Sequence, residues 1–168
     1  MSPSTKMQIG THAPDFVLSD TKNREWRLSD HRGKVVALLF YPGDETLVCT
    51  KQLCAVRDNW GKYMATGADV VGISPGSADQ HLKFAENHNL PLPLLADPER
   101  KITTLFASHW LFPVWATRGV IIIDALGILR FKSVMIRALR PTDDEVLSSI
   151  NLAKYDELSG RKTAVAAD

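Results

Sequence analysis

Two cysteines, Cys49 and Cys54, carry the clearest chemical potential in this chain. Cys49 follows an apolar segment that ends at Tyr41 and a Pro-Gly-Asp turn, and it opens a stretch with helical periodicity. A thiol at a helix N-terminus faces backbone N–H groups and the positive end of the helix dipole, which both favour the thiolate. Because the thiolate is the nucleophile, this is a position where a reactive cysteine is expected.

The same position also suits an inert thiol. Free cysteines are among the most buried residues of proteins and pack like small apolar side chains. Because Cys49 lies at a strand–turn–helix junction, a reactive thiol is about as well supported as a buried, inert one. Position alone therefore leaves both interpretations open.

Cys54 lies five residues after Cys49. In an unbroken helix such positions point about 140° apart and their Cα atoms lie ~8.5 Å apart. A disulfide needs Cα atoms within ~7 Å, so a bond between the two requires the first helical turn to unwind. A disulfide that closes so short a loop would stabilise the fold little. If both thiols are functional, redox chemistry is therefore their expected role. A packed, inert Cys54 is the alternative.

Two other polar residues have plain and functional interpretations. Thr46 lies three residues before Cys49, so its hydroxyl could reach the sulfur or a substrate oxygen, or could cap the helix. The two roles are compatible. Arg118 opens an apolar segment, and most arginines are surface residues, so its type alone favours the plain interpretation.

The elements that must position these residues are visible as short apolar segments. Residues 35–41, 68–74 and 119–124 are nearly continuous runs rich in Val and Ile, which predict strands buried on both faces of a sheet. Residues 129–133 alternate in polarity and predict a more exposed strand after a turn. Residues 16–18 and 26–28 predict an N-terminal hairpin.

Helices are predicted in the intervals between the strands. One helix runs onward from Cys49, with its apolar stripe at Leu53, Val56, Trp60 and Tyr63. Residues 77–88 and 100–106 predict shorter helices. The last helix follows Pro141, where Thr142 and Glu145 have the spacing of a capping box; its apolar face holds Val146, Leu147, Ile150 and Ala153. Together these elements predict an α/β sandwich with a mixed sheet, as a single domain over residues 1–158 with a mobile tail over 159–168.

Composition excludes several classes of function. The 168 residues carry a formal net charge of +1, and the basic residues are scattered, so neither nucleic acid nor an anionic membrane surface is an expected partner. No apolar run approaches the ~20 residues of a membrane helix. The first ten residues lack a signal peptide's apolar core, so cytoplasm is expected. The five histidines have no metal-site spacing with the cysteines, so we expect no metal and no organic cofactor.

The motif Pro42-x-x-x-Thr46-x-x-Cys49 resembles the active-site motif of the peroxiredoxins. Its flanks resemble family segments in the family's order, at residues 10–16, 32–34, 68–74, 84–97 and 118–124. The spacing from Cys49 to Cys54 is similar to that of the Q-type, or bacterioferritin-comigratory, branch. Residues 47 and 48 are Leu and Val, where that branch usually has Pro-Gly. This difference bears on the assignment to the branch more than on the chemistry of Cys49.

The resemblance implies a thioredoxin-like three-layer sandwich and a thiol peroxidase. Cys49 would be oxidised by hydrogen peroxide or organic hydroperoxides, and Cys54 would resolve the sulfenic acid. Arg118 and Thr46, with the backbone N–H groups of residues 48 and 49, would donate to the peroxide, and Pro42 would shield the sulfur. Thioredoxin or a similar dithiol would be the reductant, and the chain would be a monomer or homodimer.

Two other functions compete with a peroxidase. A thioredoxin-like disulfide oxidoreductase would use a Cys-x-x-Cys motif, which the chain lacks. A non-catalytic redox sensor would change shape through a Cys49–Cys54 disulfide. An aromatic group before Arg118 could line a path for organic hydroperoxides, form a dimer contact or cover the core; it comprises Phe106, Trp110, Phe112 and Trp115.

Overall fold

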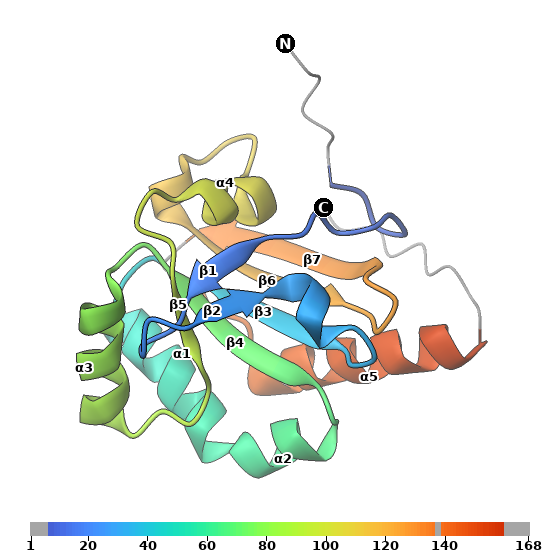
Figure 1. Ribbon diagram of the computed structural model, residues 1–168, viewed down its shortest axis with the longest axis horizontal. Helices are drawn as coiled ribbons and strands as arrows, with labels where there is room; N and C mark the ends of the chain where they lie inside the picture. Colours follow the sequence, from blue (N-terminus) through green and yellow to red (C-terminus); the bar gives the residue numbers. More distant parts are fainter. Residues whose placement is uncertain (1–6, 137–138, 160–168) are drawn as a thin grey trace.

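The computed structural model describes residues 7–136 and 139–159, and it shows one twisted sheet with helices on both faces (Figure 1). The sheet has seven strands in the order β2-β1-β5-β4-β3-β6-β7. Their bounds are β1 Val17–Ser19, β2 Glu25–Arg27, β3 Val36–Phe40, β4 Asp69–Ser74, β5 Leu94–Ala96, β6 Thr117–Ile123 and β7 Leu129–Ile136.

The sheet is mixed, as predicted. Strands β3, β4 and β5 run parallel, and the connections between them carry helices. On one side β6 pairs antiparallel with β3, and β7 pairs antiparallel with β6. On the other side the short hairpin of β1 and β2 joins through β1 to β5, also antiparallel. This hairpin confirms the N-terminal pair of strands within one residue of its predicted bounds.

Within the described residues, five α-helices and two 3-10 turns cover the sheet. Buried residues of α1, α2, α3 and α5 share one apolar cluster, whereas α4 and the turn η1 contribute to the cluster on the opposite face. Figure 1 shows the same division, with α4 apart from the other helices. The bounds are η1 Leu28–His31, α1 Leu47–Asp58, α2 Trp60–Ala65, α3 Ala78–His88, α4 Lys101–Ala107, η2 Val114–Ala116 and α5 Asp143–Ser159.

The central strand β3 explains why its sequence is continuously apolar. Ala37 and Leu39 point to the cluster beneath α1 and α5, whereas Val36, Leu38 and Phe40 point to the opposite cluster. Alternate residues of a strand face opposite sides of the sheet, so a strand covered on both faces has no polar position. The thioredoxin-like sandwich predicted from the resemblance has this layered arrangement.

The predicted caps and strand ends agree with the structure in most places. At the start of α5 the Thr142 N–H donates to the Glu145 carboxylate over 2.8 Å, and the Glu145 N–H donates to the Thr142 hydroxyl over 3.2 Å, which confirms the capping box. Strand β7 continues to Ile136, three residues beyond the predicted end at 133. The tail predicted from residue 159 lies, apart from Ser159 itself, outside the described residues. The single domain over residues 1–158 stays a prediction.

The helix predicted to run from Cys49 through Tyr63 is interrupted, so that prediction was wrong in one respect. It begins at Leu47 and ends at Asp58, and α2 starts again at Trp60. Asn59 lies at the break, where its side-chain amide donates to the Ala55 carbonyl over 3.1 Å and to the Asp143 carboxylate over 2.8 Å. The break therefore coincides with a tertiary contact to the start of α5. Among the described helices, none is long and apolar enough to cross a membrane.

Candidate active site

Strand register brings Arg118 to the start of α1. Phe40, the last residue of β3, pairs with Gly119 of β6, so Arg118 lies beside the point where the chain leaves β3. From there residues 41–46 form a short loop, and α1 begins at Leu47. Neighbouring antiparallel strands therefore place an arginine from the second half of the chain against the first turn of α1.

Cys49 is almost fully buried in that first turn, with 1% of its surface exposed. The Arg118 Nη2 donates to its Sγ over 3.1 Å. The first three N–H groups of a helix have no acceptor within the helix, and Cys49 is the third residue after the N-cap, Thr46. Two independent sources of positive potential therefore act on the sulfur, the helix N-terminus and the guanidinium.

Arg118 itself is fully buried, so its interpretation as a surface residue was wrong. Burial of an arginine is costly, and a buried guanidinium is expected to have fixed partners. Gln52 supplies one of them, because its side-chain carbonyl accepts a hydrogen bond from Arg118 Nη1. The two ends of one planar fork thus contact Cys49 and Gln52, which fixes its orientation at the sulfur.

Sequence reasoning did not identify the role of Gln52. One signal could have found it. Gln52 lies three residues after Cys49, so both side chains occupy the same face of α1. That face is the buried one, and Gln52 is 3% exposed. A polar residue on the buried face of a helix needs a partner.

Thr46 occupies the N-cap position of α1, but its hydroxyl makes neither of the predicted contacts. The backbone has the extended conformation of an N-cap, with φ −76° and ψ 147°, and the side chain forms no capping hydrogen bond. Its hydroxyl donates instead to the Gly43 carbonyl over 3.3 Å, and the residue is exposed.

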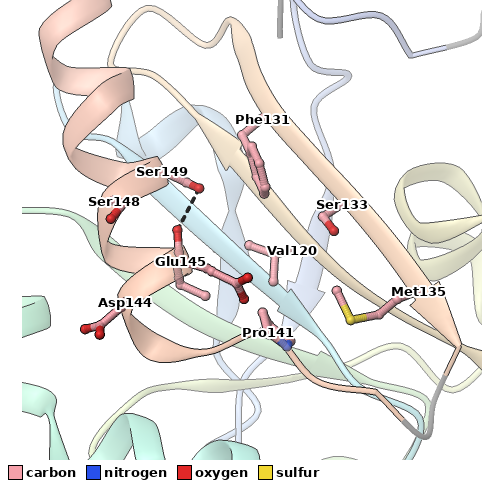
Figure 2. A pocket seen from close by; sticks show the side chains of 10 residues that line it. Val120, Phe131, Ser133, Met135, Pro141, Asp144, Glu145, Ser148 and Ser149 are labelled. Carbon is pink, nitrogen blue, oxygen red and sulfur yellow. Dashed lines mark hydrogen bonds between the residues drawn. The ribbon is translucent and has the colours of Figure 1, made fainter. Parts of the chain in front are cut away.

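Pro42 is half-buried in the loop between β3 and α1. It lines a cavity of about 550 Å³ that the loop forms with α3, together with Gly43, Asp44, Glu45 and residues of α3. A second cavity of about 500 Å³ lies between β7 and the start of α5, where Phe131, Met135 and Pro141 face the helix (Figure 2). Neither cavity has Cys49, Thr46 or Arg118 in its lining.

Cys54 is a half-buried free thiol in the same unbroken helix as Cys49, which is also a free thiol. Ideal helix geometry keeps residues five apart too distant for a disulfide. The predicted need for α1 to unwind before these two cysteines can join therefore applies to the folded chain.

The aromatic residues before Arg118 differ in burial. Phe106 is fully buried and stacks on Phe40 with ring centroids 5.9 Å apart, so it belongs to the core beneath α4. Trp110 and Trp115 are 89% and 57% exposed. A single role for all four aromatic residues is therefore wrong.

A model of the AhpC/TSA family matches residues 9–132. The chain belongs to the AhpC/TSA family. Peroxiredoxin Q of Triticum aestivum, a chloroplastic protein, is 38% identical over 131 residues, which are 75% of this chain and 58% of that protein. Peroxiredoxin Bcp of Bacillus subtilis is 41% identical over 100 residues, which are 60% of this chain and 64% of that protein.

The solved structures agree with this membership. The crystal structure of peroxidoxin BcpB from Mycobacterium tuberculosis superimposes with a TM-score of 0.74 at 28% identity, covering 87% of this chain and 97% of that one. The predicted resemblance to peroxiredoxins of the Q-type, bacterioferritin-comigratory branch is thereby confirmed, and so is the fold. The matched regions span about three fifths of the two sequence relatives' own lengths.

The contact between Gln52 and Arg118 predicts a stability effect. Gln52→Leu keeps a buried side chain of similar size but removes the carbonyl that accepts from the guanidinium. We expect the free energy of unfolding in urea to fall by about 1–3 kcal/mol, because a buried charged donor loses its acceptor. Lys51→Leu, a substitution at the exposed neighbouring position, is the control, and an equal change in both variants would contradict the assignment.

Proposed function

We propose that this chain is a thiol-dependent peroxidase that reduces hydrogen peroxide and organic hydroperoxides through a sulfenic acid on Cys49. Thioredoxin or a similar dithiol is the proposed reductant, and Cys54 is the proposed resolving thiol. No metal or organic cofactor takes part in this scheme. The cytoplasm is the proposed location and monomer or homodimer the proposed assembly; the Triticum relative is named as a chloroplast protein.

One observation carries the proposal: a fully buried guanidinium donates to the sulfur of Cys49 over 3.1 Å. A structural cysteine in an apolar core has no use for such a partner, and burying a charge beside it would only cost free energy. A nucleophilic cysteine needs one, because positive charge favours its thiolate form. Membership of the AhpC/TSA family supports the same assignment.

In the first step the Cys49 thiolate attacks the terminal oxygen of the hydroperoxide. The S–O bond forms as the O–O bond breaks, so sulfur is oxidised to the sulfenic acid and the other oxygen leaves as hydroxide or alkoxide. That oxygen takes a proton from solvent and departs as water or alcohol. Negative charge moves from sulfur to the leaving oxygen, so Arg118 and the N–H groups of residues 48 and 49 stabilise the transition state more than the ground state.

Thr46 and Pro42 have smaller proposed roles at this step. The Thr46 hydroxyl turns from the Gly43 carbonyl toward the peroxide and donates to it when substrate occupies the site. Pro42 covers the sulfur on the loop side and limits access by water and larger oxidants. Thr46 is the N-cap residue of α1, and Pro42 lies in the loop that leads to it.

In the second step the Cys54 thiolate attacks the sulfenic sulfur. The disulfide forms, and the sulfenic oxygen leaves as hydroxide that is protonated to water. The first turns of α1 unwind to bring the two sulfurs together. A dithiol then reduces the disulfide by thiol–disulfide exchange and returns both cysteines to the thiol form.

The competing functions predict different behaviour. A disulfide oxidoreductase would use Cys-x-x-Cys, whereas the two cysteines here are separated by four residues. A redox sensor would react once with peroxide and need no turnover. Sustained consumption of peroxide in the presence of a dithiol distinguishes the peroxidase from both.

The nucleophile is tested by Cys49→Ser. A serine hydroxyl is not ionised at neutral pH, so we expect thiol-dependent peroxide consumption to fall to background. Consumption is measured with thioredoxin and its reductase as the electron source, and Cys54→Ser with a monothiol reductant serves as the active comparison. More than trace turnover by Cys49→Ser would refute Cys49 as the peroxide-reducing residue.

The donor is tested by Arg118→Ala. The second-order rate constant for oxidation of Cys49 by hydrogen peroxide, measured by stopped flow in a single turnover, should fall on the order of a hundredfold. The reason is the loss of a charged donor to the developing negative charge. Circular dichroism establishes that the variant is folded, and a folded variant with the wild-type rate constant would show that Arg118 has no part in the reaction.

The resolving thiol is tested by mass spectrometry of protein treated with one equivalent of peroxide. The wild-type chain should give an intramolecular Cys49–Cys54 disulfide. Cys54→Ser should react once, stop at the sulfenic acid and over-oxidise more readily to the sulfinic acid. A wild-type product with sulfenic acid on Cys49 and a free thiol on Cys54 would mean that another molecule supplies the resolving thiol.

A further inference from the structure

The loop that leads into the candidate site is tied to α3 by a buried ion pair. The Asp44 Oδ2 and the His81 Nδ1 lie 2.5 Å apart. The His81 side chain is fully buried, and the Asp44 side chain is 13% exposed. Asp44 lies two residues after Pro42 and two before Thr46, whereas His81 is in the first turn of α3, on a different segment of the chain.

Both ring nitrogens of His81 meet hydrogen-bond acceptors. Nδ1 faces the Asp44 carboxylate, and Nε2 lies 3.1 Å from the Ser74 carbonyl at the end of β4. The Ser74 carbonyl can only accept, so Nε2 donates to it, and the proton between Nδ1 and the Asp44 carboxyl completes the second hydrogen bond. Asp44 and His81 therefore form a buried hydrogen-bonded pair, and loss of either partner would leave the other buried without its hydrogen bond.

Asp44 also connects this pair to the residue at the end of β3. The Tyr41 hydroxyl donates to Asp44 Oδ1 over 2.8 Å, so the carboxylate receives hydrogen bonds on both oxygens. Tyr41 is 2% exposed and belongs to the same apolar cluster as Cys49. Burial raises the pKa of Tyr41 well above its ordinary value, and the charges of Asp44 and Cys49 raise it further. Its proton therefore stays on the hydroxyl that holds Asp44.

Two glycines make room for the side chains of this chain of contacts. A Cβ on Gly72 of β4 would lie 3.2 Å from the Tyr41 ring and 2.8 Å from Leu94. A Cβ on Gly76 would lie 2.9 Å from the His81 ring. Neither glycine has a positive φ, so backbone conformation does not require them. The need for space around the Tyr41 and His81 rings therefore explains why these two positions are glycine.

A second ion pair joins the same loop and helix, but it is exposed. The Glu45 carboxylate contacts His88 Nε2 over 3.0 Å, with 53% and 25% of the two side chains exposed. Exposed pairs contribute little because solvent screens them. This outer pair is therefore a natural control for the buried inner pair, since both are carboxylate–histidine contacts between the same two segments.

We propose that Asp44 and His81 are positioning residues for the chemistry at Cys49. Through the Tyr41 hydroxyl and the His81 ring they hold the loop of residues 42–45 in the one conformation that sets Pro42, Thr46 and the first N–H groups of α1 around the sulfur. The inference rests on the proposed peroxidase function. It goes beyond that function because neither residue contacts Cys49 and neither would take part in a bond-making step.

Positioning affects the peroxide reaction more than the intrinsic reactivity of the thiolate. Attack on an O–O bond needs donors aimed at the leaving oxygen, and a small displacement of these donors weakens their effect on the transition state. Alkylation by iodoacetamide depends on the thiolate but not on those donors. A loosened loop should therefore slow the first reaction and leave the second unchanged or faster.

The test compares Asp44→Asn and His81→Gln with the control His88→Gln in the full chain. We expect the rate constant for oxidation of Cys49 by hydrogen peroxide to fall about tenfold or more in the two inner variants, with alkylation by iodoacetamide no slower than in the wild type. His88→Gln should stay within about twofold of the wild type in both reactions. Circular dichroism and urea unfolding show that each variant is folded.

The possible results separate the two proposals. A wild-type chain that does not react with peroxide refutes the peroxidase, whatever the variants do. A reactive wild type with folded inner variants that oxidise at the wild-type rate overturns the positioning role, and so does an equal fall in oxidation and alkylation. If the inner variants do not fold, Tyr41→Phe removes one hydroxyl and keeps the ion pair. It should slow oxidation several-fold but not alkylation, and unchanged oxidation in that variant overturns the proposal.

Discussion

The arrangement of the site depends on one contact, the guanidinium of Arg118 against the sulfur of Cys49. An arginine in a protein core loses its hydration, a cost of several kcal/mol in order of magnitude unless partners replace the water. Here the sheet supplies the position, because β6 pairs in register with β3, and α1 supplies the partners through Cys49 and Gln52. The rest of the fold holds these three segments together. The contact therefore depends on the pairing of strands in the sheet and not on α1 alone.

A second constraint opposes the first. Cys49 needs a well-formed first helical turn, because the free N–H groups and the dipole exist only when the helix does. A disulfide with Cys54 needs the same turn to open. The apolar contacts of Leu53 and Val56 resist opening, and they begin one turn after the sulfur. The N-terminal end of α1 follows a loop in which Glu45 has a left-handed φ of 59°.

The sequence predicts much of this fold because its central strands are buried on both faces and have no competing pattern. It could not predict the break at Asn59, since Val56, Trp60 and Tyr63 keep their helical spacing across it. The contact that accompanies the break reaches Asp143, 84 residues away. Gln52 is similar, because its partner lies 66 residues along the chain. Most arginines are exposed, so the residue type argued against burial of Arg118. Only the resemblance to the family motif favoured a place for Arg118 in the site. The side-chain rotamer of Thr46 depends on local contacts, which the spacing of residues in the sequence does not reveal.

The break at Asn59 has a consequence for the protein during oxidation. Helix formation is cooperative along an uninterrupted segment, and the hydrogen-bonded segment that contains both cysteines stops at Asp58. Beyond it, α2 is held separately by Tyr63, whose hydroxyl donates to Asp143 over 2.7 Å. Loss of structure in α1 therefore need not propagate into α2, and the apolar surface beneath α2 stays covered. If the start of α1 opens to form the proposed Cys49–Cys54 disulfide, the apolar surface beneath α2 would stay buried, and exposure of such surface is what promotes aggregation.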